Sequence, residues 1–114
     1  MKFRAGRGVR RKPGEMNKTE QAYADHLEAL RIGGEVVAWT FDALKLRLAD
    51  NTFYTPDFLV QKPDDTLEVH EVKGHWEDDA RVKMKVAASL FPFRFLAMKP
   101  LAKKHGGGWE VETF

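Results

Sequence analysis

The sequence predicts an α/β fold in which two main helices flank a mixed β-sheet of about five strands. One amphipathic segment precedes a series of short apolar runs, and a second amphipathic segment interrupts that series before its last members. The runs are rich in Val, Leu and Phe and are bounded by Pro, Asp, Asn or Gly, which is typical of strands. A helix between two such runs indicates a right-handed crossover to a parallel strand, so the sheet should contain pairs of both kinds.

Length and charge indicate one domain with a basic extension. A chain of 114 residues has room for a single hydrophobic core. Six of the 19 basic residues precede Pro13 with no acid among them, which leaves 13 basic against 17 acidic residues in the remainder. We therefore expect residues 1–14 to form a flexible basic arm that follows phosphates, and residues 15–114 to form the domain. A solubilising tail is the simpler alternative for the arm.

Composition narrows the class of protein. The chain is 43% hydrophobic, has no apolar stretch long enough for a transmembrane helix and has no apolar segment behind its basic N-terminus. We therefore expect no membrane partner and no secretory signal. The absence of cysteine excludes disulfides and thiolate metal sites, which fits a cytoplasmic location.

The first helix is predicted over residues 17–31. Asn17 is a suitable N-cap with Glu20 three residues later, and Gly33 supplies the stop. Glu20 has two interpretations: it closes a capping box with Asn17, or it points from the helix towards the site described below. The apolar residues that recur at helical spacing are Tyr23, Ala24, Leu27 and Leu30.

The second helix is predicted over residues 77–90, with an acidic first turn. We expect its buried stripe to comprise Val82, Val86 and Leu90, with Met84 and Ala87 nearby. A strand over residues 93–98 should follow it. Residues 109–114 add an edge strand or a dimer contact.

The strands between the two helices are expected to form an antiparallel meander. Residues 35–41 and 44–48 are strand-like, and a turn at residues 49–52 leads to the next run. The runs over residues 54–60 and 67–74 then form a hairpin around the turn at residues 62–65.

This hairpin collects charged residues at one end. Glu71 and Lys73 are two apart on a strand, so their side chains share a face, and the hairpin register can bring Asp57 beside them. Two carboxylates with the carbonyl of Val72 suit Mg²⁺, for which Mn²⁺ can substitute. Lys73 would position water or stabilise negative charge as a phosphodiester is hydrolysed. The simpler interpretation is a turn aspartate and a surface ion pair worth about 0–1 kcal/mol.

Pro56-Asp57, a 13-residue spacer and Glu71-Val72-Lys73 resemble the signature of the PD-(D/E)XK nuclease superfamily. The stretch from Asn17 to about Met98 is similar to a family of small phage-encoded proteins of that superfamily, with phage junction-resolving endonucleases as distant functional relatives. The resemblance implies a restriction-endonuclease-like fold and a Mg²⁺-dependent DNA endonuclease, selective for junctions or branched DNA, in the host cytoplasm. It assigns catalysis to Glu20, Asp57, Glu71 and Lys73, and gives Glu20 a share in the metal site.

Basic residues elsewhere are candidates for contact with DNA, and cutting both DNA strands would require a homodimer. The rival hypothesis is a non-catalytic nucleic-acid-binding or partner-binding module on a nuclease-like scaffold. The candidate DNA contacts are Arg4, Arg7, Arg10, Arg11, Lys12, His75, Arg81 and Lys83.

Overall fold

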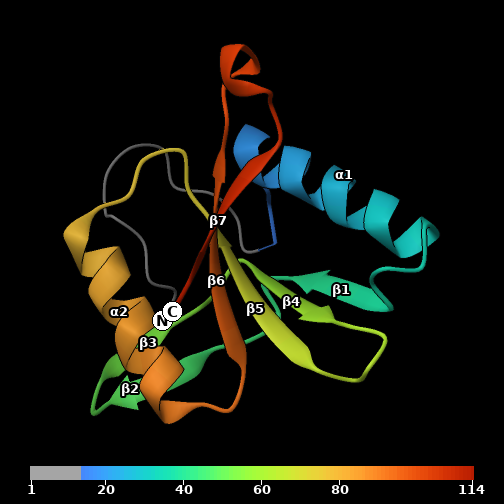
Figure 1. Cartoon of the computed structure of the whole chain (residues 1–114). Coiled ribbons are helices and arrows are strands. Elements are labelled where there is room, and N and C mark those ends of the chain that lie inside the picture. The colour runs from blue at the N-terminus through green and yellow to red at the C-terminus, as the bar shows by residue number, and fades with distance from the viewer. Residues whose placement is uncertain (1–13) are drawn as a thin grey trace.

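A five-stranded mixed sheet in the order β1-β4-β5-β6-β7 forms the centre of the computed structural model, which describes residues 14–114 (Figure 1). The pair β5–β6 is parallel, and the other three pairs are antiparallel. The predicted α/β class, mixed sheet and two helices are confirmed. The five strands are β1 (Ala38–Phe41), β4 (Phe58–Gln61), β5 (Leu67–Val72), β6 (Arg94–Pro100) and β7 (Trp109–Thr113), and the two helices are α1 (Lys18–Ile32) and α2 (Asp78–Leu90).

Helix α1 begins and ends where its sequence signals predict. The Asn17 side chain accepts a hydrogen bond from the Glu20 N–H at 2.8 Å, and the Glu20 carboxylate accepts one from the Asn17 N–H at 2.9 Å. This reciprocal capping box satisfies two N–H groups that a helix start leaves unpaired. At the other end, the Gly33 N–H donates to the carbonyl of Ala29.

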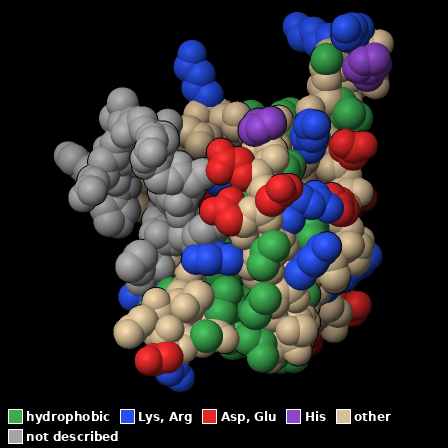
Figure 2. Space-filling view, turned by 90° about the vertical axis from the view of Figure 1, so that its left-hand side faces the viewer, with side chains coloured by type: hydrophobic (Ala, Val, Ile, Leu, Met, Phe, Trp, Pro, Cys, Tyr) green, Lys and Arg blue, Asp and Glu red, His purple; other side chains and the backbone are tan. Residues whose placement is uncertain are grey.

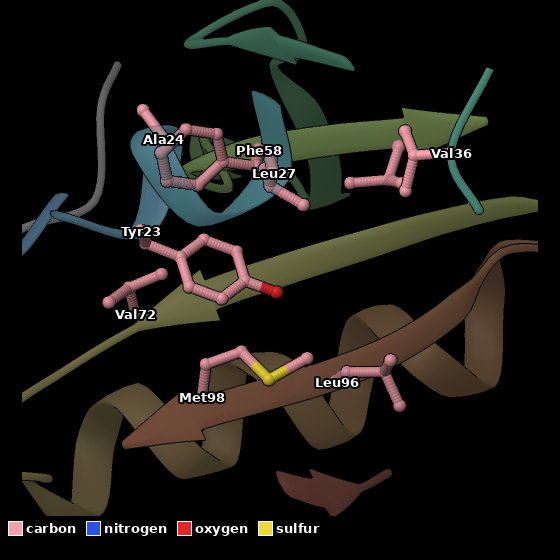
Figure 3. Close-up of a cluster of buried hydrophobic side chains, with 9 residues drawn as sticks. Tyr23, Ala24, Leu27, Val36, Phe58, Val72, Leu96 and Met98 are labelled. Carbon is pink, nitrogen blue, oxygen red and sulfur yellow. The ribbon is translucent and has the colours of Figure 1, made fainter. Parts of the chain in front are cut away.

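The two helices cover opposite faces of the sheet (Figure 1). Beneath α1, Tyr23 and Leu27 pack against strand residues Phe58, Val72 and Met98, as Figure 3 shows. Removing this much apolar surface from water is the main force that holds α1 on the sheet.

The opposite face is covered by α2 together with a small second sheet. Strands β2 (Leu46–Ala49) and β3 (Thr52–Tyr54) form this antiparallel pair. Met84 of α2 and Leu46 of β2 share a core cluster with Val69 and Phe95 of the main sheet.

The predicted four-strand meander is therefore wrong in one respect. Strand β1 pairs with β4, and the segment between them leaves the main sheet. Asp42 directly after β1 has a φ of 62°, a left-handed conformation that turns the chain out of the sheet. The predicted turn at residues 49–52 is present, with Asn51 at a φ of 52°. The predicted turn of the β4–β5 hairpin is also present, and the Lys62 N–H donates to the Thr66 carbonyl.

The predicted buried stripe of α2 is wrong for Val82, Val86 and Leu90, although Met84 and Ala87, which were expected nearby, are buried. Val82 and Leu90 are 57% and 54% exposed, whereas Ala80, Met84 and Ala87 are buried. Both sets recur at helical spacing, so periodicity alone does not decide between them. Small alanines allow the helix to lie close to the sheet, which explains why the less apolar face is inside. Figure 2 shows hydrophobic side chains gathered on the side of the molecule where α2 lies.

The C-terminal strand and the character of the helices test two further expectations. Strand β7 pairs with β6 at the edge of the main sheet, which confirms the predicted edge strand. Between β6 and β7 lies the short 3₁₀ helix η1 (Lys103–His105). No helix within residues 14–114 has the length and apolar character needed to span a bilayer.

The corrected orientation of α2 predicts unequal losses from two substitutions on one helix. Met84→Ala should lower the free energy of unfolding by about 2–5 kcal/mol because it leaves a cavity between α2 and the sheet. Val82→Ala, at a position that is 57% exposed, should change it by less than about 0.5 kcal/mol. Urea unfolding of both variants measures the difference, and equal losses would contradict the orientation.

Candidate metal centre

The β4–β5 hairpin brings the Asp57 and Glu71 carboxylates together at one end of the sheet. Phe58 pairs with His70, so Asp57 just before β4 lies beside Glu71 on β5. The Asp57 N–H donates to Glu71 Oε1 at 2.9 Å, and the Val72 N–H donates to Asp57 Oδ2 at 2.9 Å. Each carboxylate is thus held by the backbone of the opposite segment. The predicted juxtaposition of Asp57 and Glu71 is confirmed.

Tyr54 adds a hydrogen bond that the sequence reasoning missed. Its hydroxyl donates to Glu71 Oε1 at 3.0 Å, and the ring is buried in the cluster beneath α2. A tyrosine in an apolar strand needs a partner for its hydroxyl when it is buried, and this requirement could have indicated the hydrogen bond from the sequence. Burial, followed by the negative charges of Glu71 and Asp57, raises the Tyr54 pKa well above its usual value. Tyr54 therefore remains a neutral donor that fixes one oxygen of Glu71.

Both carboxylates are almost completely removed from water. Asp57 is 5% exposed and Glu71 2% exposed. Burial raises the pKa of Asp57 well above its usual range, and the negative charges of Glu71 and Glu20 raise it further. Burial also raises the pKa of Glu71, against the opposing effect of the Lys73 charge. The pair therefore carries its negative charge at a cost that a cation would offset.

Lys73 stands on the same side of β5 as Glu71, as its spacing predicts. Its Nζ lies 3.7 Å from Glu71 Oε2, and its side chain is 26% exposed. That distance is an ion-pair contact but too long for a good hydrogen bond. The ammonium therefore remains able to donate to a further ligand.

Glu20 reaches this region from the N-terminus of α1. Its side chain is 1% exposed, and its charge contributes to raising the pKa of both Asp57 and Glu71. One oxygen is committed to the capping box, which confirms the structural interpretation of Glu20. Its share in a metal site stays a prediction, and at present it adds to the negative charge that a cation would meet.

The remaining oxygen atoms fit a Mg²⁺ ion. The hydrogen bonds described above use Asp57 Oδ2 and Glu71 Oε1, which leaves the second oxygen of each carboxylate. The Lys73 N–H donates to the Met98 carbonyl on β6, so the trans peptide directs the Val72 carbonyl away from β6, to the side where Asp57 lies.

Mg²⁺ is typically bound through one or two carboxylates and keeps several waters, so this donor set is adequate. Across residues 14–114, no three or more His, Asp or Glu side chains gather into a complete metal cage. Any ion bound here would complete its shell with water or substrate oxygens.

The predicted DNA contacts are distributed unevenly. His75 lies exposed just beyond β5. Arg81 forms a two-point ion pair with Glu112 of β7, and Lys83 Nζ lies 3.5 Å from the Phe53 carbonyl. Arg81 is therefore already paired with a carboxylate and is a poorer candidate than its sequence position indicates. Arg4, Arg7, Arg10, Arg11 and Lys12 lie outside the described residues.

A second buried polar group lies on the opposite face of the sheet, and Arg94 pairs with its Glu68 from the surface. The Tyr23 hydroxyl is 2.6 Å from His70 Nδ1, and His70 Nε2 is 2.8 Å from Glu68 Oε1. Burial lowers the His70 pKa, so the neutral ring donates to Glu68 and accepts from Tyr23. His70 therefore packs on the sheet beneath α1, in contact with Tyr23.

Comparison with protein-family models, curated proteins and solved structures finds no match to this chain. The interpretation of the centre accordingly depends on its geometry and on the motif.

The raised carboxyl pKa values predict that metal-free protein loses stability as pH rises. A folded-state pKa above the unfolded value means that the folded chain retains protons which the unfolded chain releases above about pH 4. The free energy of unfolding should therefore fall as pH rises from about 4 through the raised values. Asp57→Asn keeps an acceptor for the Val72 N–H but removes a charge, and should raise stability at pH 8 in EDTA by about 0.5–2 kcal/mol.

Urea unfolding between pH 5 and pH 8 measures this effect, with Glu28→Gln as the control. The Glu28 carboxylate pairs with Arg31 at the surface, and that hydrogen bond lowers its pKa to about 2. Its contribution is present above the unfolded pKa and is lost only in strong acid, so Glu28→Gln should bring no gain at pH 8. A loss of stability in Asp57→Asn would indicate a structural ion-pair network in place of a frustrated charge pair.

Proposed function

We propose that the protein is a metal-dependent DNA endonuclease of the PD-(D/E)XK type, with a restriction-endonuclease-like core. The observation that carries this proposal is the pair of buried carboxylates, Asp57 and Glu71, locked by hydrogen bonds beside Lys73. These are the three positions at which the chain resembles the superfamily signature. The arrangement of α1, the β1–β4–β5 strands, α2 and parallel β6 agrees with what that resemblance implies.

A structural ion pair is a poor explanation of the same residues. Lys73 supplies one positive charge, whereas Asp57, Glu71 and Glu20 place three carboxyl groups in the vicinity. Buried charge that lacks a counterion is costly, and a fold maintains it where a ligand supplies the missing charge. A divalent cation held by Asp57, Glu71 and the Val72 carbonyl would supply that charge.

The chain's own groups then have distinct roles. Bound Mg²⁺ supplies charge neutralisation at a phosphoryl oxygen and a lowered pKa for water. Tyr54 and the backbone N–H groups keep the two carboxylates oriented. Lys73, with donors to spare, stabilises the negative charge that develops on the phosphodiester.

DNA is the proposed substrate because the motif resemblance and the basic N-terminal residues both favour a polyanion. Branched DNA in phage DNA metabolism, in the host cytoplasm, is the substrate class that the resemblance suggests. One compact protomer offers one such centre, so cutting both strands of a duplex or junction would require a homodimer. The exposed residues of α2 and the outer edge of β7, which pairs with no strand within residues 14–114, are candidates for that contact.

A gel cleavage assay tests the proposal. The substrates are four-way junction, flap, single-stranded and linear duplex DNA, each with Mg²⁺, Mn²⁺ or EDTA. We expect cutting that depends on the metal and that falls by at least about 100-fold in Lys73→Ala, because the variant loses a charge that acts in the transition state. Lys62→Ala is the matched control, since Lys62 lies in the turn at the other end of the β4–β5 hairpin.

Two outcomes would contradict the proposal. Tight DNA binding without cutting under any metal would favour the non-catalytic binding module. Cutting that Lys73→Ala and Lys62→Ala reduce equally would show that Lys73 has no special part in the reaction.

A further inference from the structure

A second lysine, Lys99, lies beside Lys73 on the neighbouring strand. Strands β5 and β6 run parallel, with Val72 paired to Met98. The Lys73 N–H donates to the Met98 carbonyl, so the ladder continues by one residue and sets Lys99 next to Lys73. Adjacent strands are about 4.8 Å apart, so the backbones of the two lysines are direct neighbours in the sheet.

Both side chains emerge on the same face. Residues two apart on a strand share a face, and Ala97 packs in the core cluster beneath α2 together with Val69. Lys99 therefore lies on the α2 side of the sheet, as Lys73 does. There it lines a hollow of about 380 Å³ whose other charged or aromatic residues are Trp76, Arg81, Glu110 and Glu112.

Among residues 14–114, Lys99 forms no ion pair, although Glu110 is its register partner on β7 and lines the same hollow. Glu112 is already engaged by Arg81 in the same hollow. Like charges at directly neighbouring positions of two strands are destabilising. The arrangement therefore favours an anion that both ammonium groups can approach.

We propose that Lys99 forms a subsite for a non-scissile phosphate of the bound nucleic acid, next to the phosphate that meets Lys73. This inference rests on the proposed function. An ammonium is a compact point charge with three donors, suited to an anion whose oxygens present no fixed fork geometry. Lys99 lies one strand further from Glu71 than Lys73 does, so it binds and positions the nucleic acid and takes no part in catalysis.

The test combines equilibrium binding with cleavage. A short DNA duplex is titrated with the wild type, Lys99→Ala and Lys62→Ala in Ca²⁺ across a range of salt concentrations, and cleavage kinetics are measured in Mg²⁺. A single phosphate contact contributes about 0.9 to the slope of log affinity against log salt. Lys99→Ala should lower the magnitude of the slope by about that much, raise Kd about tenfold at about 50 mM salt and raise KM while kcat stays unchanged.

The possible outcomes distinguish failure of the Lys99 subsite from failure of the proposed nuclease activity. If the wild type cuts DNA and Lys99→Ala binds with the same salt slope as Lys62→Ala, the subsite is wrong and the nuclease stands. If the wild type binds without cutting and Lys99→Ala still lowers the slope, the phosphate contact stands and the nuclease fails. A fall in kcat with unchanged KM would assign Lys99 to the chemical step and overturn a purely binding role. Absence of DNA binding by the wild type would overturn both proposals.

Discussion

The reciprocal hydrogen bonds between the Asp57 and Glu71 segments are the constraint on which the centre depends. The backbone N–H of Asp57 donates a hydrogen bond to the Glu71 carboxylate, and that of Val72 donates one to the Asp57 carboxylate. Each carboxylate is therefore anchored by the segment that carries the other. This arrangement requires the chain to enter β4 in register with β5. The register of the hairpin therefore positions the charged groups, and the two cores on either side of the sheet hold the hairpin in place.

The same constraint has a thermodynamic consequence. Hydrogen bonds to the charged form partly compensate for burial, yet the pKa of both carboxyls is raised. The doubly charged pair therefore needs a nearby positive charge to be stable. A protein selected for stability alone would replace one partner with a neutral residue. Retaining both, with Glu20 nearby, is what the proposed metal site would require. Lys73 and Lys99 would then face the anion that this cation attracts.

Local sequence signals predicted the parts of the fold that are determined locally. The Asn17–Glu20 capping box and the β4–β5 hairpin follow from residue types at short spacing, and so does the position of Asp57 beside Glu71. The inward face of α2 could not be predicted, because Val82, Val86 and Leu90 have the same period as the buried Ala80, Met84 and Ala87.

Tertiary packing determined the remaining features. Strands β2 and β3 lie outside the main sheet because the chain bends at Asp42 and Leu46 packs against α2. Lys99 lies next to Lys73 because of the parallel register of two strands that a helix separates in the sequence. A contact of that kind has no local signature.

Calorimetric titration with Mn²⁺ at neutral pH tests whether Asp57 and Glu71 bind a metal ion. We expect saturable binding to the wild type, loss of that binding in both Asp57→Asn and Glu71→Gln, and retention of it in Glu28→Gln, because the ion needs both buried carboxylates. Absence of binding to the folded wild type, or equal binding to all four proteins, would contradict the assignment of a metal centre to Asp57 and Glu71.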